Sequence, residues 1–184
     1  MNKWKIFIFL ILVSCSSNKN FVSIDSANHA TIEVLEKNYS RSFGSGKLTG
    51  KGKSNFSSNF VFESKDDFSY IVFKDILGRK LFLVEINGEK TRYVDMRKNK
   101  EIDVEDFNKF LPIATKFDSN TYKRLLWGTP NVFKDLQIKT RNIFLISTKL
   151  ISIDGSNFLN ELTFTLNNDK QKYTILFTRR NFEI

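Results

Sequence analysis

Alternation of apolar and polar residues with a period of two dominates the chain after Tyr39, and this feature constrains the fold most. It predicts strands at about 44–53, 56–64, 67–75, 79–87, 89–95 and 99–102, and again at about 134–140, 143–151, 159–167 and 171–179. Turn residues separate the segments, most clearly the hairpin signal Asn87-Gly88 and the turns at Asp154-Gly155 and 167–169. Because short connections join antiparallel strands, the chain is predicted to be mainly β, with about ten sequential strands.

Helical spacing interrupts the strand pattern in three places. Ile32, Leu35 and Tyr39 predict a helix over about 26–39, with residue 25 or 26 as its N-cap. A second helix is expected between Asp103 and Pro112, and a third over about 119–127, ended by Gly128. Strands with helices at few positions favour a curved sheet covered on one face.

The N-terminal residues have the pattern of an export signal. Lys3 and Lys5 precede the apolar run 6–13, which is too short to cross a bilayer as a helix and is followed by Cys15. The run Leu-Val-Ser-Cys at 12–15 resembles the lipobox of bacterial lipoproteins. That resemblance implies that Cys15 is lipidated and becomes the new N-terminus, and two or more acyl chains give a stable membrane anchor.

This reading divides the chain into a cleaved signal (1–14), a lipidated N-terminus and tether (15–25) and a single domain (26–184). Cys15 is the only cysteine, so no disulfide is expected, and burial of the 19 phenylalanines must supply much of the stability.

The formal net charge of +9 at pH 7 falls by two when the signal is removed. Scattered basic residues suit an anionic membrane surface or acidic partners, but a general bias towards Lys, Asn, Ile and Phe explains them equally well. Nucleic acid is not expected as a partner, because no basic stripe is present and the chain carries an export signal.

Catalytic residues are not evident in the sequence. His29 is the only histidine and is expected on the surface of the first helix, without a second ligand for a metal or a partner for a nucleophile. The glycines at 44, 46, 50 and 52 do not have the spacing of a phosphate loop, and they fit a curved or closely approached strand. We therefore expect no enzyme activity, no cofactor and no metal.

An apolar turn is predicted between the third and fourth strands, with Ile76 and Leu77 at its tip. Polar residues are usual at such a position. Two interpretations remain open from the residues alone: Leu77 folds back onto the core of its own chain, or it is exposed for binding.

Several short motifs resemble the LolB family, the outer-membrane receptors for lipoproteins that share a fold with the periplasmic carrier LolA. They are Tyr-Ser-Arg-Ser-Phe-Gly-Ser-Gly at 39–46, Asp-Ile-Leu-Gly at 75–78, Val-Asp at 94–95, Leu-Pro-Ile at 111–113 and Leu-Leu-Trp-Gly-Thr-Pro at 125–130. The resemblance covers most of 26–184. Ile76 stands where the family usually has proline, and the stretch after Pro130 is shorter, by about one hairpin.

The resemblance implies an incomplete antiparallel β-barrel whose open side is covered by helices and whose apolar cavity binds the acyl chains of a lipoprotein. It implies that the protein receives this cargo from a LolA-like carrier, as a monomer, and that Ile76 and Leu77 enter the membrane to deliver it. Ser16 after the lipidated cysteine lacks the aspartate that retains lipoproteins in the inner membrane, so the periplasmic face of the outer membrane is expected.

Alternate residues of the predicted strands are the candidates for the cavity wall: Phe60, Phe62, Ile71, Phe73, Leu81 and Leu83. The same residues equally suit a solid core, because the pattern does not distinguish the two. A second hypothesis therefore stands beside the first, namely a lipid-anchored binding or scaffold protein of the same fold that holds another amphiphile or an envelope partner.

Overall fold

A computed structural model of the chain describes residues 29, 31–52, 55–111, 117–132, 143–166 and 171–184. Within them, nine antiparallel strands form one sheet in the order β6-β5-β4-β3-β2-β1-β9-β8-β7. The strands are β1 (Arg41–Lys51), β2 (Phe56–Lys65), β3 (Phe68–Lys74), β4 (Lys80–Asn87), β5 (Lys90–Asp95), β6 (Lys100–Ile102), β7 (Ile143–Ile153), β8 (Ser156–Leu166) and β9 (Lys172–Glu183). The prediction of a mainly β fold with sequential antiparallel strands is confirmed.

The sheet consists of two meanders that meet at the first and last strands. β1 to β6 follow one another, and β9 then pairs with the free side of β1 over most of its length. The edge strands β6 and β7 are not paired with each other in the described part of the chain. The predicted strand at 134–140 and the turn at 167–169 lie outside the described residues.

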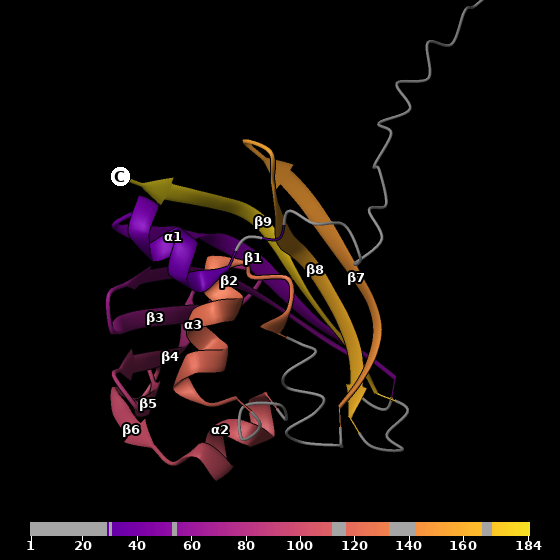
Figure 1. Cartoon of the computed structure of the whole chain (residues 1–184). Coiled ribbons are helices and arrows are strands. Elements are labelled where there is room, and N and C mark those ends of the chain that lie inside the picture. Colours follow the sequence, from indigo (N-terminus) through magenta and orange to yellow (C-terminus); the bar gives the residue numbers. More distant parts are fainter. Residues whose placement is uncertain (1–28, 30, 53–54, 112–116, 133–142, 167–170) are drawn as a thin grey trace, which may run out of the picture.

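Three helices, α1 (Ile32–Asn38), α2 (Val104–Phe110) and α3 (Ser119–Trp127), lie on the same side of the curved sheet (Figure 1). Asp103 caps α2 by accepting a hydrogen bond from the Asp106 N–H, and Asp118 caps α3 in the same way. Gly128 ends α3 in the left-handed conformation, at a φ of 80°. The predicted start of α2 at Asp103 and the predicted end of α3 at Gly128 are therefore confirmed, whereas Pro112 lies outside the described residues.

The first helix is shorter than predicted. It begins at Ile32 with Thr31 as its N-cap, and the predicted caps at 25 and 26 lie outside the described residues. The sequence predicts His29 on this helix, and this prediction is wrong. His29 lies before the helix and forms an isolated parallel bridge with Asn157 of β8. The spacing of neighbouring residues does not predict such a bridge, because the two residues that it joins are far apart in the sequence.

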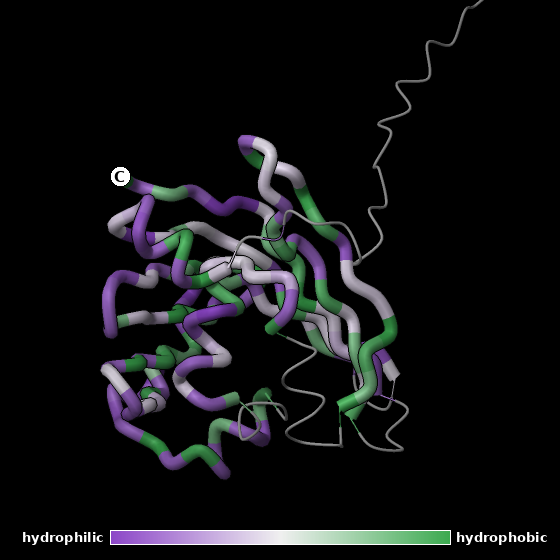
Figure 2. The backbone as a smooth tube through the Cα atoms, viewed as in Figure 1, coloured by the Kyte–Doolittle hydropathy of each residue, from purple (hydrophilic) through white to green (hydrophobic). Residues whose placement is uncertain are grey.

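Apolar side chains fill the space between the helices and the concave face of the sheet. Hydrophobic and hydrophilic residues alternate along much of the backbone in Figure 2, as expected for strands with one covered face. Phe107 of α2 is fully buried, and its ring packs against those of Tyr93, Phe82 and Phe73. A second, smaller cluster joins Leu35 of α1 to Trp127 of α3.

Glycines on the concave side of β1 leave room for aromatic rings. A Cβ atom at Gly46 would lie 2.2 Å from the ring of Phe60, and one at Gly50 would lie 2.2 Å from the ring of Phe56. These distances are far below van der Waals contact, so only glycine fits. The expectation that alternate glycines mark a closely approached strand is confirmed.

Candidate functional site

The turn between β3 and β4 holds two of the most exposed large apolar side chains of the described residues. Ile76 is 81% exposed and Leu77 is 73% exposed. Leu77 therefore does not fold back onto the core, which decides between the two interpretations left open by the sequence. Exposed apolar side chains at a hairpin tip contribute little to stability, because folding removes little of their surface from water.

Asp75 holds this turn in a defined shape. One carboxylate oxygen accepts hydrogen bonds from the backbone N–H groups of Leu77 and Arg79, both at 2.9 Å, and the other oxygen pairs with the Arg79 guanidinium at 2.6 Å. Gly78 takes a positive φ of 81°, and its own N–H donates to the Asp75 carbonyl. These hydrogen bonds brace the turn, which means that they hold it, with Ile76 and Leu77 at its tip, in one conformation.

The hydrogen bonds that hold the turn also keep the Asp75 carboxyl group ionised. Desolvation alone raises the pKa of the carboxyl group, but the hydrogen bonds from the Arg79 side chain and from the two backbone N–H groups outweigh it. The pKa therefore lies below its ordinary value, and the carboxylate remains charged at neutral pH.

A small apolar cavity of about 30 Å³ lies between the concave face of the sheet and α3. An engineered apolar cavity that binds benzene measures ~150 Å³, several times this volume. The surrounding residues come from β1, β2, β3, β9, α3 and the segments next to the helices: Leu48, Phe60, Ile71, Phe73, Leu111, Phe117, Tyr122, Leu125, Leu126, Ile175 and Phe177. The interior is therefore packed around a space far smaller than a fatty acyl chain.

Of the predicted cavity residues, Phe60, Ile71 and Phe73 line this space. Phe62 is buried beside them in the same core, where its ring meets that of Phe177 edge-on.

Leu81 and Leu83 of β4 do not line this small cavity, although Leu81 is partly buried and packs against the same core. The buried residues of β4 alternate as Phe82, Val84 and Ile86, which leaves Leu83 on the other face. Apolar residues occupy both alternating sets of this strand, so its pattern does not fix the phase. A register shift between Phe73 and Lys74 further displaces the pairing near Leu81.

The sequence did not identify the walls contributed by α3 and β9. Tyr122, Leu125 and Leu126 lie within the predicted third helix, but helical spacing does not show that they cover a cavity. Ile175 and Phe177 of β9 reach the site because β9 pairs with β1 across more than 120 positions of the chain. No local signal predicts such a pairing.

Arg180 of β9 fixes the C-terminal end of α3 to the sheet. Its guanidinium donates hydrogen bonds to the carbonyl groups of Leu125, Leu126 and Leu159, and it lies 4.0 Å from the ring centre of Phe177. Burial lowers the pKa of Arg180 to about 9, which still leaves it charged at neutral pH. Two of these carbonyl groups belong to the last turn of α3 and the third belongs to β8, so Arg180 joins the end of the helix to the sheet.

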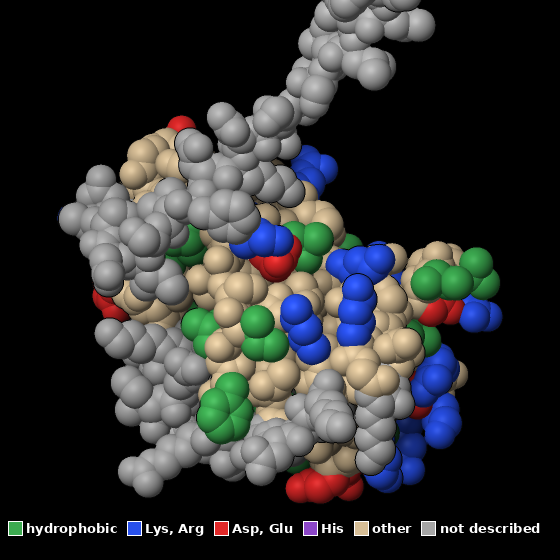
Figure 3. All heavy atoms as spheres, turned by 90° about the vertical axis from the view of Figure 1, so that its right-hand side faces the viewer, with side chains coloured by type: hydrophobic (Ala, Val, Ile, Leu, Met, Phe, Trp, Pro, Cys, Tyr) green, Lys and Arg blue, Asp and Glu red, His purple; other side chains and the backbone are tan. Residues whose placement is uncertain are grey.

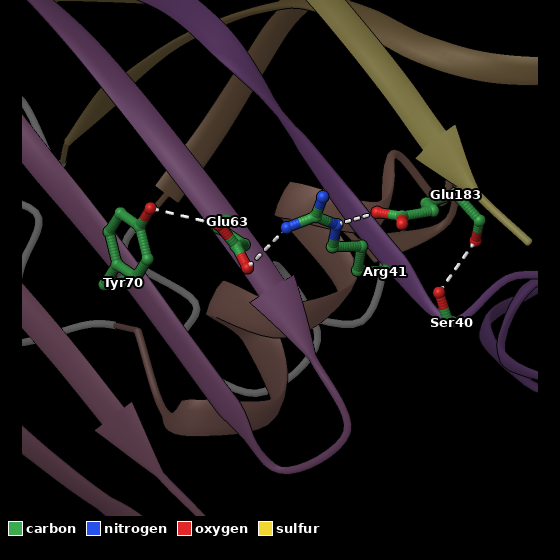
Figure 4. Close-up of polar contacts among 5 residues, drawn as sticks. All are labelled: Ser40, Arg41, Glu63, Tyr70 and Glu183. Atoms are coloured by element: carbon green, nitrogen blue, oxygen red, sulfur yellow. Dashed lines mark hydrogen bonds and ion pairs between the residues drawn. The ribbon is translucent and has the colours of Figure 1, made fainter.

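A polar network occupies the convex face of β1 to β3 (Figure 4). Arg41 pairs with Glu63 and with Glu183, and Glu63 also accepts a hydrogen bond from the Tyr70 hydroxyl. Ser40 donates to the Glu183 carbonyl at 3.1 Å. Hydrogen bonds to the two glutamates raise the pKa of Arg41. Every charge in the network has a partner, so its arrangement indicates a role in joining β9 to β1 and β2.

The described residues contain no group of histidines, cysteines and carboxylates that could hold a metal ion. None of the helices in the same part of the chain is both long and apolar enough to cross a membrane. Cys15 lies outside the described residues. Comparison of the chain with models of known protein families and with curated proteins found no match.

Proposed function

We propose that this protein is a lipid-anchored receptor of the LolB kind on the periplasmic face of the outer membrane. In this proposal it takes acylated lipoproteins from a soluble LolA-like carrier and inserts them into the membrane, as a monomer and without catalysis. Cys15 carries the lipid anchor. In this proposal the open, curved sheet corresponds to the incomplete barrel that the resemblance implies, with α2 and α3 over its open side.

The single observation that carries the proposal is the exposed pair Ile76 and Leu77 on a braced turn. The turn that presents these two side chains to solvent is held by the hydrogen bonds between Asp75 and Arg79 and by the positive φ of Gly78. A turn that served folding alone would have polar residues at its tip, as the β4–β5 turn does.

The second part of the proposal, the sheltering of cargo, requires an apolar site that holds an acyl chain. Burial of an acyl chain of ~16 carbons at ~0.8 kcal/mol per methylene is worth ~12 kcal/mol, so release into water is strongly unfavourable. Cargo must pass directly from one apolar site to the next. At about 30 Å³ the cavity has to widen for this, which requires α3 to separate from β1, β2 and β9.

Substitution Leu77→Glu tests the proposal. We expect the variant to take cargo from the carrier with unchanged affinity but to insert it into vesicles at least about tenfold more slowly, because a buried carboxylate is costly in an apolar environment. Val34→Glu is the matched control, since Val34 is 54% exposed on α1, far from the turn in the chain. Insertion by the Leu77→Glu variant at the control's rate would refute the assigned role.

The small volume of the cavity favours one alternative, a lipid-anchored binding or scaffold protein that holds a smaller amphiphile or an envelope partner. Mass spectrometry of the protein after gentle extraction distinguishes the two. Lipoprotein acyl chains in the bound fraction support the receptor, and another lipid, or none, supports the alternative.

A further inference from the structure

Strand register brings together lysines that are far apart in the sequence. Lys47 of β1 lies opposite Asn59 of β2, Asn59 lies opposite Lys74 of β3, and Lys74 lies opposite Lys80 of β4. Paired residues of neighbouring strands lie on the same face where the register is regular, as it is for Lys47, Asn59 and Lys74. Lys80 comes opposite Lys74 through the register shift that leaves Leu81 without a paired residue in β3. Three lysines therefore form one row across four strands, which we call the lysine row (Lys47, Lys74 and Lys80).

The lysine row lies at the base of the apolar turn. Lys74 is the last residue of β3 and Lys80 is the first of β4, so the two flank the segment that carries Ile76 and Leu77. The Ser58 hydroxyl donates to the Lys74 carbonyl at 2.8 Å, which fixes the end of β3. Lys47 and Lys80 are exposed and Lys74 is partly exposed.

Within the described part of the chain, no carboxylate forms an ion pair that balances the positive charge of the row. None of the three lysines forms an ion pair with a residue that the structure describes. Asp75, the carboxylate next to the row, is already paired with Arg79. Glu161, which lies further along the same line on β8, is paired with Lys149.

The other end of the same meander has a different character. The β2–β3 turn there contains Asp66 and Asp67, and the β4–β5 turn contains Glu89 next to Lys90. Basic and hydrophobic side chains also lie close to each other at one edge of the molecule in Figure 3. Unbalanced lysines and an exposed apolar tip thus occur together at one end of the sheet.

From this juxtaposition we propose that the apolar turn enters a bilayer rich in anionic lipid, with the lysine row in contact with the anionic headgroups. The inference rests on the proposed membrane role of the turn and adds the lipid class that it selects. Ile76 and Leu77 supply apolar area, and the lysines at the base lie at the level of the headgroups when the tip enters the acyl region. An acidic protein would match the charges but would leave the tip unexplained.

The test uses the full lipid-anchored protein reconstituted into vesicles. A Leu77→Cys variant labelled with a polarity-sensitive dye reports the ratio of inserted to exposed turns. Vesicles of phosphatidylcholine alone are compared with an equal mixture of phosphatidylcholine and phosphatidylglycerol. Each basic residue near an anionic surface strengthens binding by about fivefold, so we expect the ratio to rise by about tenfold to a hundredfold in the mixture and to fall with added salt.

Two sets of substitutions in the labelled protein separate the lysine row from net charge. Lys47→Glu, Lys74→Glu and Lys80→Glu together should abolish the preference for the anionic mixture. Lys37→Glu, Lys65→Glu and Lys90→Glu, exposed positions outside the row with the same change in charge, should retain most of it. Equal insertion into both vesicle types, or equal loss in both sets, would overturn the lipid selectivity but leave the receptor role standing. A dye that stays exposed in both vesicle types would overturn both.

Discussion

Apolar residues of the interior and apolar residues at the β3–β4 turn are used in opposite ways. Phe107 and Leu126 are almost fully buried, and the folded state depends on the surface they remove from water. Ile76 and Leu77 remain exposed although the turn around them is ordered by Asp75. The comparison shows that the order of the turn does not come from packing of its apolar side chains against the interior. Stability resides in the interior, and the turn is free to serve an interaction.

The largest effect on stability is expected from Phe107→Ala, which empties the centre of the aromatic cluster between α2 and the sheet. Loss of a fully buried ring costs about 3–5 kcal/mol of the free energy of unfolding. Urea unfolding followed by circular dichroism measures it. Val34→Ala, at an exposed position of α1, should change this free energy by less than about 0.5 kcal/mol. Equal effects of the two substitutions would break the contrast.

Arg180→Met should have the next largest effect. It leaves the carbonyl groups of Leu125, Leu126 and Leu159 without their guanidinium donor, at a cost of about 2–3 kcal/mol in the free energy of unfolding. Arg179→Met is the matched control, because the Arg179 side chain is exposed. A loss no greater than the control's would show that Arg180 does not hold α3 to the sheet.

Much of this architecture could be predicted, because strand alternation, Asn87-Gly88 and the caps at Asp103 and Gly128 are local signals. Exposure of Leu77 was left open, since a sequence does not show whether a turn residue folds inward. The phase of β4 could not be predicted, because Leu81 and Leu83 alternate with the equally apolar Phe82 and Val84. The lysine row was also missed: its members are up to 33 positions apart, and only the register of four strands aligns them.

Asp75→Ala should have the smallest effect on stability and a clear effect on local order. Without the carboxylate the N–H groups of Leu77 and Arg79 lose their acceptor, so their hydrogen exchange should become at least about tenfold faster. Asp67→Ala, in the turn at the other end of the sheet, should leave both rates unchanged. Unchanged rates in the Asp75→Ala variant would show that the turn does not need its brace.

The pH dependence of this brace has a definite sign. Because the pKa of Asp75 in the folded protein lies below the ordinary value, the ordering is fully present above the ordinary carboxyl pKa of about 3.9. It is lost as the pH falls through the lower pKa of the folded state. The hydrogen-exchange rate of the Leu77 N–H, corrected for the intrinsic effect of pH on amide exchange, should therefore rise only when the pH falls below the ordinary carboxyl pKa of about 3.9.

The central claim is that the interior beneath α3 widens to hold an acyl chain. Native mass spectrometry of the protein mixed with a diacylated lipopeptide tests it most directly. The account predicts a one-to-one complex, which Leu125→Trp weakens by filling the cavity, whereas Val34→Trp on α1 leaves it intact. Absence of the complex, or equal binding by both variants, would contradict it.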